Sequence, residues 1–98
     1  MTYDQFSASL TASAPPASFS PLLRALWHAA RSEWKQAHEL AQENESDAAH
    51  NWLHAYLHRL EGDRSNAAYW YRRASRPVFQ GTLADELREM LLAQLQKE

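Results

Sequence analysis

The chain contains no cysteine, no isoleucine and only one valine. The absence of cysteine excludes disulfides, thiolate nucleophiles and cysteine-bound metals. Strands favour β-branched residues, so their scarcity argues against a sheet. No apolar run approaches the ~20 residues of a membrane span, and the first residues lack the basic start and apolar stretch of a secretory signal. We therefore expect a cytoplasmic protein that has no membrane partner.

What the chain has in quantity is alanine, leucine, glutamate, glutamine and arginine, which are good helix formers. Its 98 residues suffice for one domain, and 45% hydrophobic with 22% charged residues is an ordinary globular composition. The net charge of −2 provides no basic field that would attract nucleic acid. The composition predicts a single all-α domain over residues 1–98 that does not bind nucleic acid.

The sequence repeats itself loosely at a constant offset of 30 residues. The aligned pairs include Leu23 with Leu53, Ala25 with Ala55, His28 with His58, and Ala37 with Ala67. Each copy also contains a turn-like break, at residues 31–33 and again at 61–63. A fixed period of a few tens of residues is typical of stacked helical hairpins.

Start and stop signals divide the chain into an N-terminal arm and a series of helices. The expected helices run from Ser20 to about Arg31, from about Ser32 to Asn44, from Ser46 or Asp47 to Gly62, from Asp63 to just before Pro77, and from Thr82 to residue 97. The linkers are short, so consecutive helices should pack antiparallel. Residues 1–18 are expected to be an extended arm because Pro15 and Pro16 oppose a long helix, although the spacing of Tyr3, Phe6 and Leu10 also allows a short docked turn.

The second copy resembles a tetratricopeptide repeat. The matching positions are the small residue Ala55, the turn Gly62-Asp63, the pair Ala67 and Tyr71, and the later Ala74. Over residues 18–77 the resemblance implies a right-handed array of two antiparallel hairpins, 19–44 and 46–77, with 82–97 as a closing helix. The offset of 30 residues is shorter than the family's 34, which implies a different packing angle. The segments 52–59 and 69–74 are also similar to short bacterial proteins of uncharacterised activity.

The repeat pattern places the first helix of each hairpin on a concave surface. The residues of this predicted groove are Phe19, Leu22, Leu26, Trp52, Tyr56 and Arg59. Aromatic residues and arginine are enriched at binding hot spots, so we expect a non-enzymatic adaptor that holds a protein or peptide segment. Two alternatives stay open: the same side chains form ordinary core, or residues 1–17 fill the groove.

Charge is distributed unevenly along the chain. Residues 59–76 carry a net charge of +3 and residues 33–47 a net charge of −4. Arg64, Arg72, Arg73 and Arg76 form a candidate basic patch for a carboxylate or phosphate, or else a solvated helix face paired with Glu and Asp. Association of the two poles, or contact through Leu92, would instead give a self-associating module such as a homodimer.

Three histidines form a stripe at intervals of four residues: His50, His54 and His58. His50 and His58 are ~12 Å apart along a helix and cannot share one ion, and a closed site would need ligands from other helices. We therefore expect no metal or cofactor, with His54 and His58 as the only candidate ligands. His28 and His58 are expected to pack and form hydrogen bonds.

No catalytic motif is recognisable, neither a nucleophile elbow nor a glycine-rich phosphate loop. His54, His58 and Glu61 could act in acid–base chemistry, as could any surface histidine beside a glutamate. We expect the protein not to be an enzyme, and an enzyme based on these histidines is the least favoured function.

Overall fold

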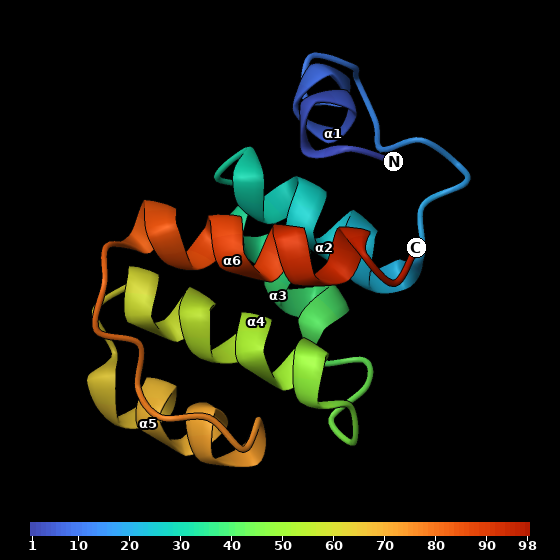
Figure 1. Ribbon diagram of the computed structural model, residues 1–98. Coiled ribbons are helices and arrows are strands. Elements are labelled where there is room, and N and C mark those ends of the chain that lie inside the picture. Colours follow the sequence, from blue (N-terminus) through green and yellow to red (C-terminus); the bar gives the residue numbers. More distant parts are fainter.

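A computed structural model describes all 98 residues, and every regular element in it is a helix (Figure 1). The helices are α1 (Tyr3–Ser9), α2 (Pro21–Ala30), α3 (Trp34–Ala41), α4 (Ala48–Leu60), α5 (Arg64–Arg73) and α6 (Leu83–Leu95). The predicted all-α class is confirmed. None of these helices is long and apolar enough to cross a membrane.

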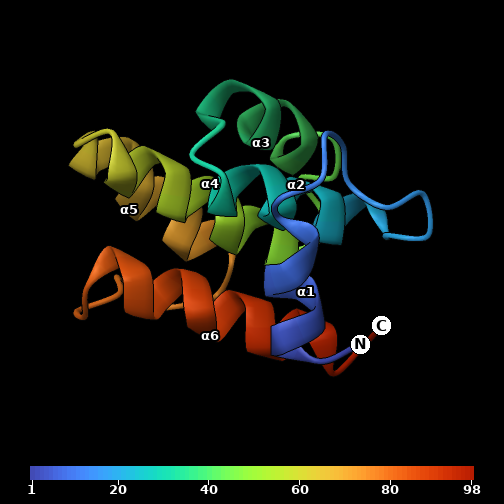
Figure 2. The same ribbon diagram turned by 90° about the horizontal axis from the view of Figure 1, so that it is seen from above.

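The helices form two consecutive hairpins covered by a long C-terminal helix. α2 packs against α3, α4 packs against α5, and α3 joins the hairpins by contacting α4. Figure 2 shows α6 on one side of α2 and α4, with α3 on the other side. α6 contacts both α2 and α4, so it lies across the two hairpins and does not extend the array beyond α5.

Side-chain caps start four of the helices at the positions that the sequence predicts. Ser20, Asp47, Asp63 and Thr82 each accept a hydrogen bond from the backbone N–H three residues further on. Such caps satisfy an N–H group that otherwise has no partner within the helix. Asp47, and not Ser46, is therefore the N-cap residue of α4.

The N-terminal segment is not extended, and that prediction is wrong. Thr2 and Gln5 form a reciprocal capping box that starts α1. The buried Phe6 stacks on Phe19 with ring centroids 6.0 Å apart, and the Trp27 indole donates a hydrogen bond of 3.2 Å to the Ser9 carbonyl. The allowed alternative, a short docked turn of helix, is the one that forms.

α3 is shorter than the predicted span of residues 32–44. Ser32 has φ = 61°, in the left-handed region, so the helix cannot begin before the turn is complete. Glu33 occupies the N-cap position without a side-chain cap. The helix begins at Trp34 and ends at Ala41.

Equivalent positions of the two copies build one core. The relative exposures are Leu23 2% and Leu53 0%, Ala25 0% and Ala55 0%, Ala37 0% and Ala67 3%. Alanine at these positions allows paired helices to approach closely. The repeat in the sequence therefore corresponds to repeated packing in the structure.

Candidate functional site

α6 covers the surface on which the sequence places a partner. The relative exposures of the predicted groove residues are Phe19 4%, Leu22 6%, Leu26 1%, Trp52 6% and Tyr56 5%. The segment that lies over α2 and α4 is α6, and α1 does not contact α4. The alternative that residues 1–17 fill the groove is therefore met only at Phe19, on which Phe6 stacks. The groove is reduced to a cleft along one edge of α6.

Glu86 fixes α6 to the second hairpin. This carboxylate is fully buried and accepts hydrogen bonds from Trp52 Nε1 at 2.9 Å and from Arg59 Nη1 at 2.8 Å. The Tyr71 hydroxyl donates to it as well. Arg59 also donates through Nη2 to the Gly81 carbonyl. Trp52 and Arg59, predicted to hold a partner, therefore bind a carboxylate of their own chain.

Burial and the bond to Glu86 raise the pKa of Tyr71 far above its ordinary value, so its hydroxyl remains a donor. Sequence analysis overlooked Glu86. A signal was present, since Glu86 lies three residues after Leu83 and four before Met90 and so falls on the apolar stripe of that helix.

A cleft of about 130 Å³ remains open between α2, α4 and α6. It is lined by Leu22, Leu26, Ala48, Ala49, Trp52, Arg76, Met90, Ala93, Gln94 and Lys97. Three of these residues, Leu22, Leu26 and Trp52, belong to the predicted groove. The other groove residues, Phe19, Tyr56 and Arg59, do not reach the cleft. The lining is largely apolar, carries two cations and contains no carboxylate.

Arg76 is the predicted basic-patch residue that reaches this cleft. Its guanidinium carbon lies 3.4 Å from the centroid of the Trp52 ring, a cation–π arrangement. It forms no ion pair with any carboxylate of the chain; the arginines that do are Arg31 and Arg59. Arg76 thus presents an unneutralised, planar donor beside an apolar cavity.

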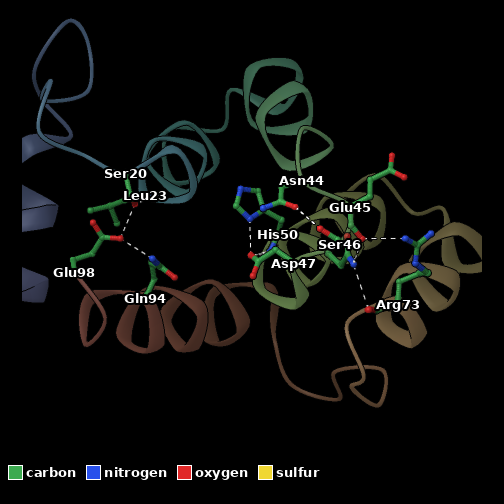
Figure 3. A network of polar contacts seen from close by, with 11 residues as sticks. Ser20, Leu23, Asn44, Glu45, Ser46, Asp47, His50, Arg73, Gln94 and Glu98 are labelled. Carbon is green, nitrogen blue, oxygen red and sulfur yellow. Dashed lines mark hydrogen bonds and ion pairs between the residues drawn. The ribbon is translucent and has the colours of Figure 1, made fainter.

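The other patch residues lie apart from the cleft. Arg73 donates to the Glu45 carbonyl at 3.0 Å (Figure 3) and to the Tyr69 hydroxyl at 3.1 Å. Arg72 lies over the Tyr69 ring, and Arg64 lines a separate hollow. The alternative pairing of Arg64, Arg72, Arg73 and Arg76 with Glu or Asp does not occur, and Arg64 and Arg76 line different hollows.

The acidic groups near the α6 end of the cleft already have partners (Figure 3). Glu98 accepts hydrogen bonds of 2.6 Å from Ser20 Oγ and from Gln94 Nε2. Asp47 accepts from His50 Nδ1 at 2.6 Å, and this bond lowers the pKa of Asp47. Neither carboxylate lines the cleft.

The histidines of the two copies bond to carboxylates at equivalent turns. His28 Nδ1 lies 2.8 Å from Glu33 Oε1, and His58 Nδ1 lies 2.7 Å from Glu61 Oε1. Both histidines form hydrogen bonds as predicted, but only His28 bonds to the paired helix, at the N-cap of α3, whereas His58 bonds to the C-cap of its own helix. The bond from His28 lowers the pKa of Glu33.

His38, His54 and His58 form a cluster between α3 and α4. One ring nitrogen from each lies within 4.8 Å of the other two. Burial, and then the positive charges that His38 and His58 would carry, lower the pKa of His54 to about 4. Burial also lowers the pKa of His38. The imidazoles of His38 and His54 are thereby favoured as neutral rings at pH 7.

Sequence analysis missed His38, although its spacing of four residues from Trp34 places both on one helix face. His50, which belongs to the same stripe as His54 and His58, lies outside the cluster.

Comparisons with protein-family models, with curated proteins and with solved structures find no match to this chain. The likeness to tetratricopeptide repeats therefore remains a prediction from the sequence.

Proposed function

We propose that the protein is a non-enzymatic binding module whose cleft between α2, α4 and α6 accepts a segment of another protein. The partner places one apolar side chain in the cleft and a carboxylate beside Arg76. The observation that carries the proposal is the unpaired Arg76 guanidinium, stacked on Trp52 at the edge of an apolar cavity.

Size and charge support this assignment of the partner's chemistry. A cavity of about 150 Å³ holds benzene, so a cleft of about 130 Å³ accommodates one aliphatic side chain. Arg76 and Lys97 supply positive charge, and the lining supplies no negative charge. Arginine matches a carboxylate with two parallel N–H donors.

Two substitutions test the cleft without disturbing the core. Arg76→Glu reverses the charge of an exposed side chain, and Ala93→Arg fills the cleft from an exposed position on α6. Arg72→Glu is the matched control, because Arg72 is exposed, unpaired and outside the cleft. Circular dichroism verifies that each variant remains folded.

The measurement is selection from a displayed library of random peptides on the full chain. We expect selected peptides to carry an apolar residue next to an acidic one. Their affinity should fall at least tenfold in Arg76→Glu and Ala93→Arg and stay unchanged in Arg72→Glu, since loss of a charged hydrogen bond amounts to about 1.5–3 kcal/mol. Failure to select any peptide, or equal binding by all variants, would contradict the proposal.

A further inference from the structure

The cluster of His38, His54 and His58 is independent of the cleft and has the composition of a metal site. Its ring centroids are 4.6 Å apart for His38 and His54, 5.3 Å for His38 and His58, and 5.0 Å for His54 and His58. Four-coordinate zinc takes histidine nitrogens at about 2.0–2.1 Å, so the three nitrogens would lie about 3.3 Å apart. Because the three nitrogens already lie within 4.8 Å of one another, small side-chain movements would bring them to this spacing. His38 is only partly buried, so its ring has room to move.

One member of the cluster has an unsatisfied polar atom. His54 is 3% exposed, and its Nδ1 is buried without a hydrogen-bond partner. Leaving a buried polar atom unpaired is unfavourable by about 1–3 kcal/mol, so such atoms are rare in proteins. An imidazole in this situation is available as a ligand.

The surroundings hold the three rings in place. His58 Nδ1 is bonded to Glu61 Oε1 at 2.7 Å, which leaves Nε2 as the nitrogen available to an ion. Metal-binding histidines are commonly oriented by a carboxylate in this way. Trp34 stacks on His38 with centroids 4.6 Å apart, and Trp70 stacks on His54 with centroids 3.8 Å apart.

A second grouping of possible ligands, His58 with Glu61 and Asp63, shares His58 with the cluster. Asp63 accepts hydrogen bonds from the backbone and the side chain of Asn66 as the cap of α5, so the histidine cluster is the better ligand set.

We propose that His38, His54 and His58 bind one divalent late transition-metal ion, with Zn²⁺ as the first candidate, and that Glu61 is a positioning residue for His58. Three imidazole nitrogen donors suit Zn²⁺, Cu²⁺ or Ni²⁺, whereas Mg²⁺ and Ca²⁺ prefer oxygen ligands. The partial exposure of His38 leaves room for water as the fourth ligand.

Titration of the metal-free full chain with Zn²⁺, in competition with a chromophoric chelator, tests this site. We expect one ion per chain in the wild type. Loss of an outer-shell partner weakens metal binding by about 10- to 100-fold, and we expect Glu61→Gln to have an effect of this size. His38→Ala removes a ligand and should weaken binding by more than this.

His50→Gln is the matched control, since His50 lies on the same helix as His54 and His58 but outside the cluster. The Zn²⁺ affinity of this variant should equal that of the wild type. His38→Gln serves as a second variant if His38→Ala does not fold. Binding of Co²⁺ should produce the visible absorption of a four-coordinate ion in the wild type and not in the His38 variants. Absence of Zn²⁺ binding, or binding that survives both His38 substitutions, would overturn the proposal.

Discussion

In the first hairpin the turn between the helices contains Ser32 at φ = 61°, and in the second it contains Gly62 at φ = 85°. The packing positions of the two hairpins match, but other positions do not. His38 corresponds to Ala68, Trp34 to Arg64, and Ser46 to Arg76. Residues that both copies share build the core. Residues that distinguish the copies supply two of the three clustered histidines, His38 and His54, and the cation beside the cleft.

The two hairpins also differ in how they hold α6. α6 packs on both of them, yet the side chains that donate to Glu86 all belong to the second hairpin: Trp52, Arg59 and Tyr71. The first hairpin contributes mainly apolar contact to α6. This asymmetry makes Glu86 the residue whose loss should have the largest effect.

We expect Glu86→Ala to lower the free energy of unfolding by about 3–5 kcal/mol, because it leaves Arg59 and two further buried donors without their acceptor. Urea denaturation measures the change. Glu89→Ala, an exposed change on the same helix, should stay within about 0.5 kcal/mol. A loss below about 1 kcal/mol in Glu86→Ala would show that α6 is held by apolar packing alone.

The second prediction concerns His54, which corresponds to the exposed Arg24 of the first hairpin. The pKa of His54 is lowered from 6.5 to about 4 in the folded chain, so the unfolded state binds more protons between these values. Stability should therefore be complete above pH 6.5 and fall by about 3 kcal/mol as the pH approaches 4.

Urea midpoints of chelator-treated protein between pH 7 and pH 4.5 measure this dependence. His54→Leu should reduce this dependence, because one titrating group is removed while His38, whose pKa burial also lowers, remains. The pKa values of Asp47 and Asp63 are lowered from 3.8, so protonation of these carboxylates reduces the free energy of unfolding mainly at lower pH. An unchanged pH dependence in His54→Leu would refute the assignment.

The smallest expected effects come from exchanging the turn residues. Gly62→Ala should lower the free energy of unfolding by about 1 kcal/mol, since an L-residue is disfavoured in the left-handed region; an added Cβ would meet no atom within 4 Å. Ser32→Gly should raise the free energy of unfolding by about 0.5 kcal/mol, because glycine adopts the left-handed conformation readily. The gain is small because glycine loses more backbone entropy on folding than serine. Thermal denaturation compares both variants. If both substitutions changed the stability in the same direction, the left-handed backbone conformation would not be the cause.

The sequence was sufficient to predict the elements whose signals are local. Ser20, Asp47, Asp63 and Thr82 were identifiable as caps, and Gly62 as a helix terminator. The capping box of Thr2 and Gln5 is equally local, and the proline pair further along the chain does not prevent α1 from forming. Alanine at equivalent positions predicted the close packing of the hairpins.

The site was less predictable because it depends on which distant elements meet. Nothing local specifies that α6 lies over α2 and α4, so Phe19 and Tyr56 were expected at a partner surface and are buried instead. The histidine stripe indicated His54 and His58, but His38 joins them only because α3 packs on α4. Leu92, named as a possible contact for self-association, is exposed.

If the cleft and the histidine cluster are two separate sites, the four tryptophans should report on them separately. Trp52 lines the cleft, Trp34 and Trp70 flank the histidine cluster, and Trp27 contacts the α1 segment. The indole N–H signals of the ¹⁵N-labelled chain would be followed by NMR in two titrations, with Zn²⁺ and with a short peptide that carries one leucine beside two glutamates.

We predict that Zn²⁺ moves the signals of Trp34 and Trp70, that the peptide moves the signal of Trp52, and that neither moves that of Trp27. Signals that do not respond, or that all respond alike to both ligands, would contradict the account.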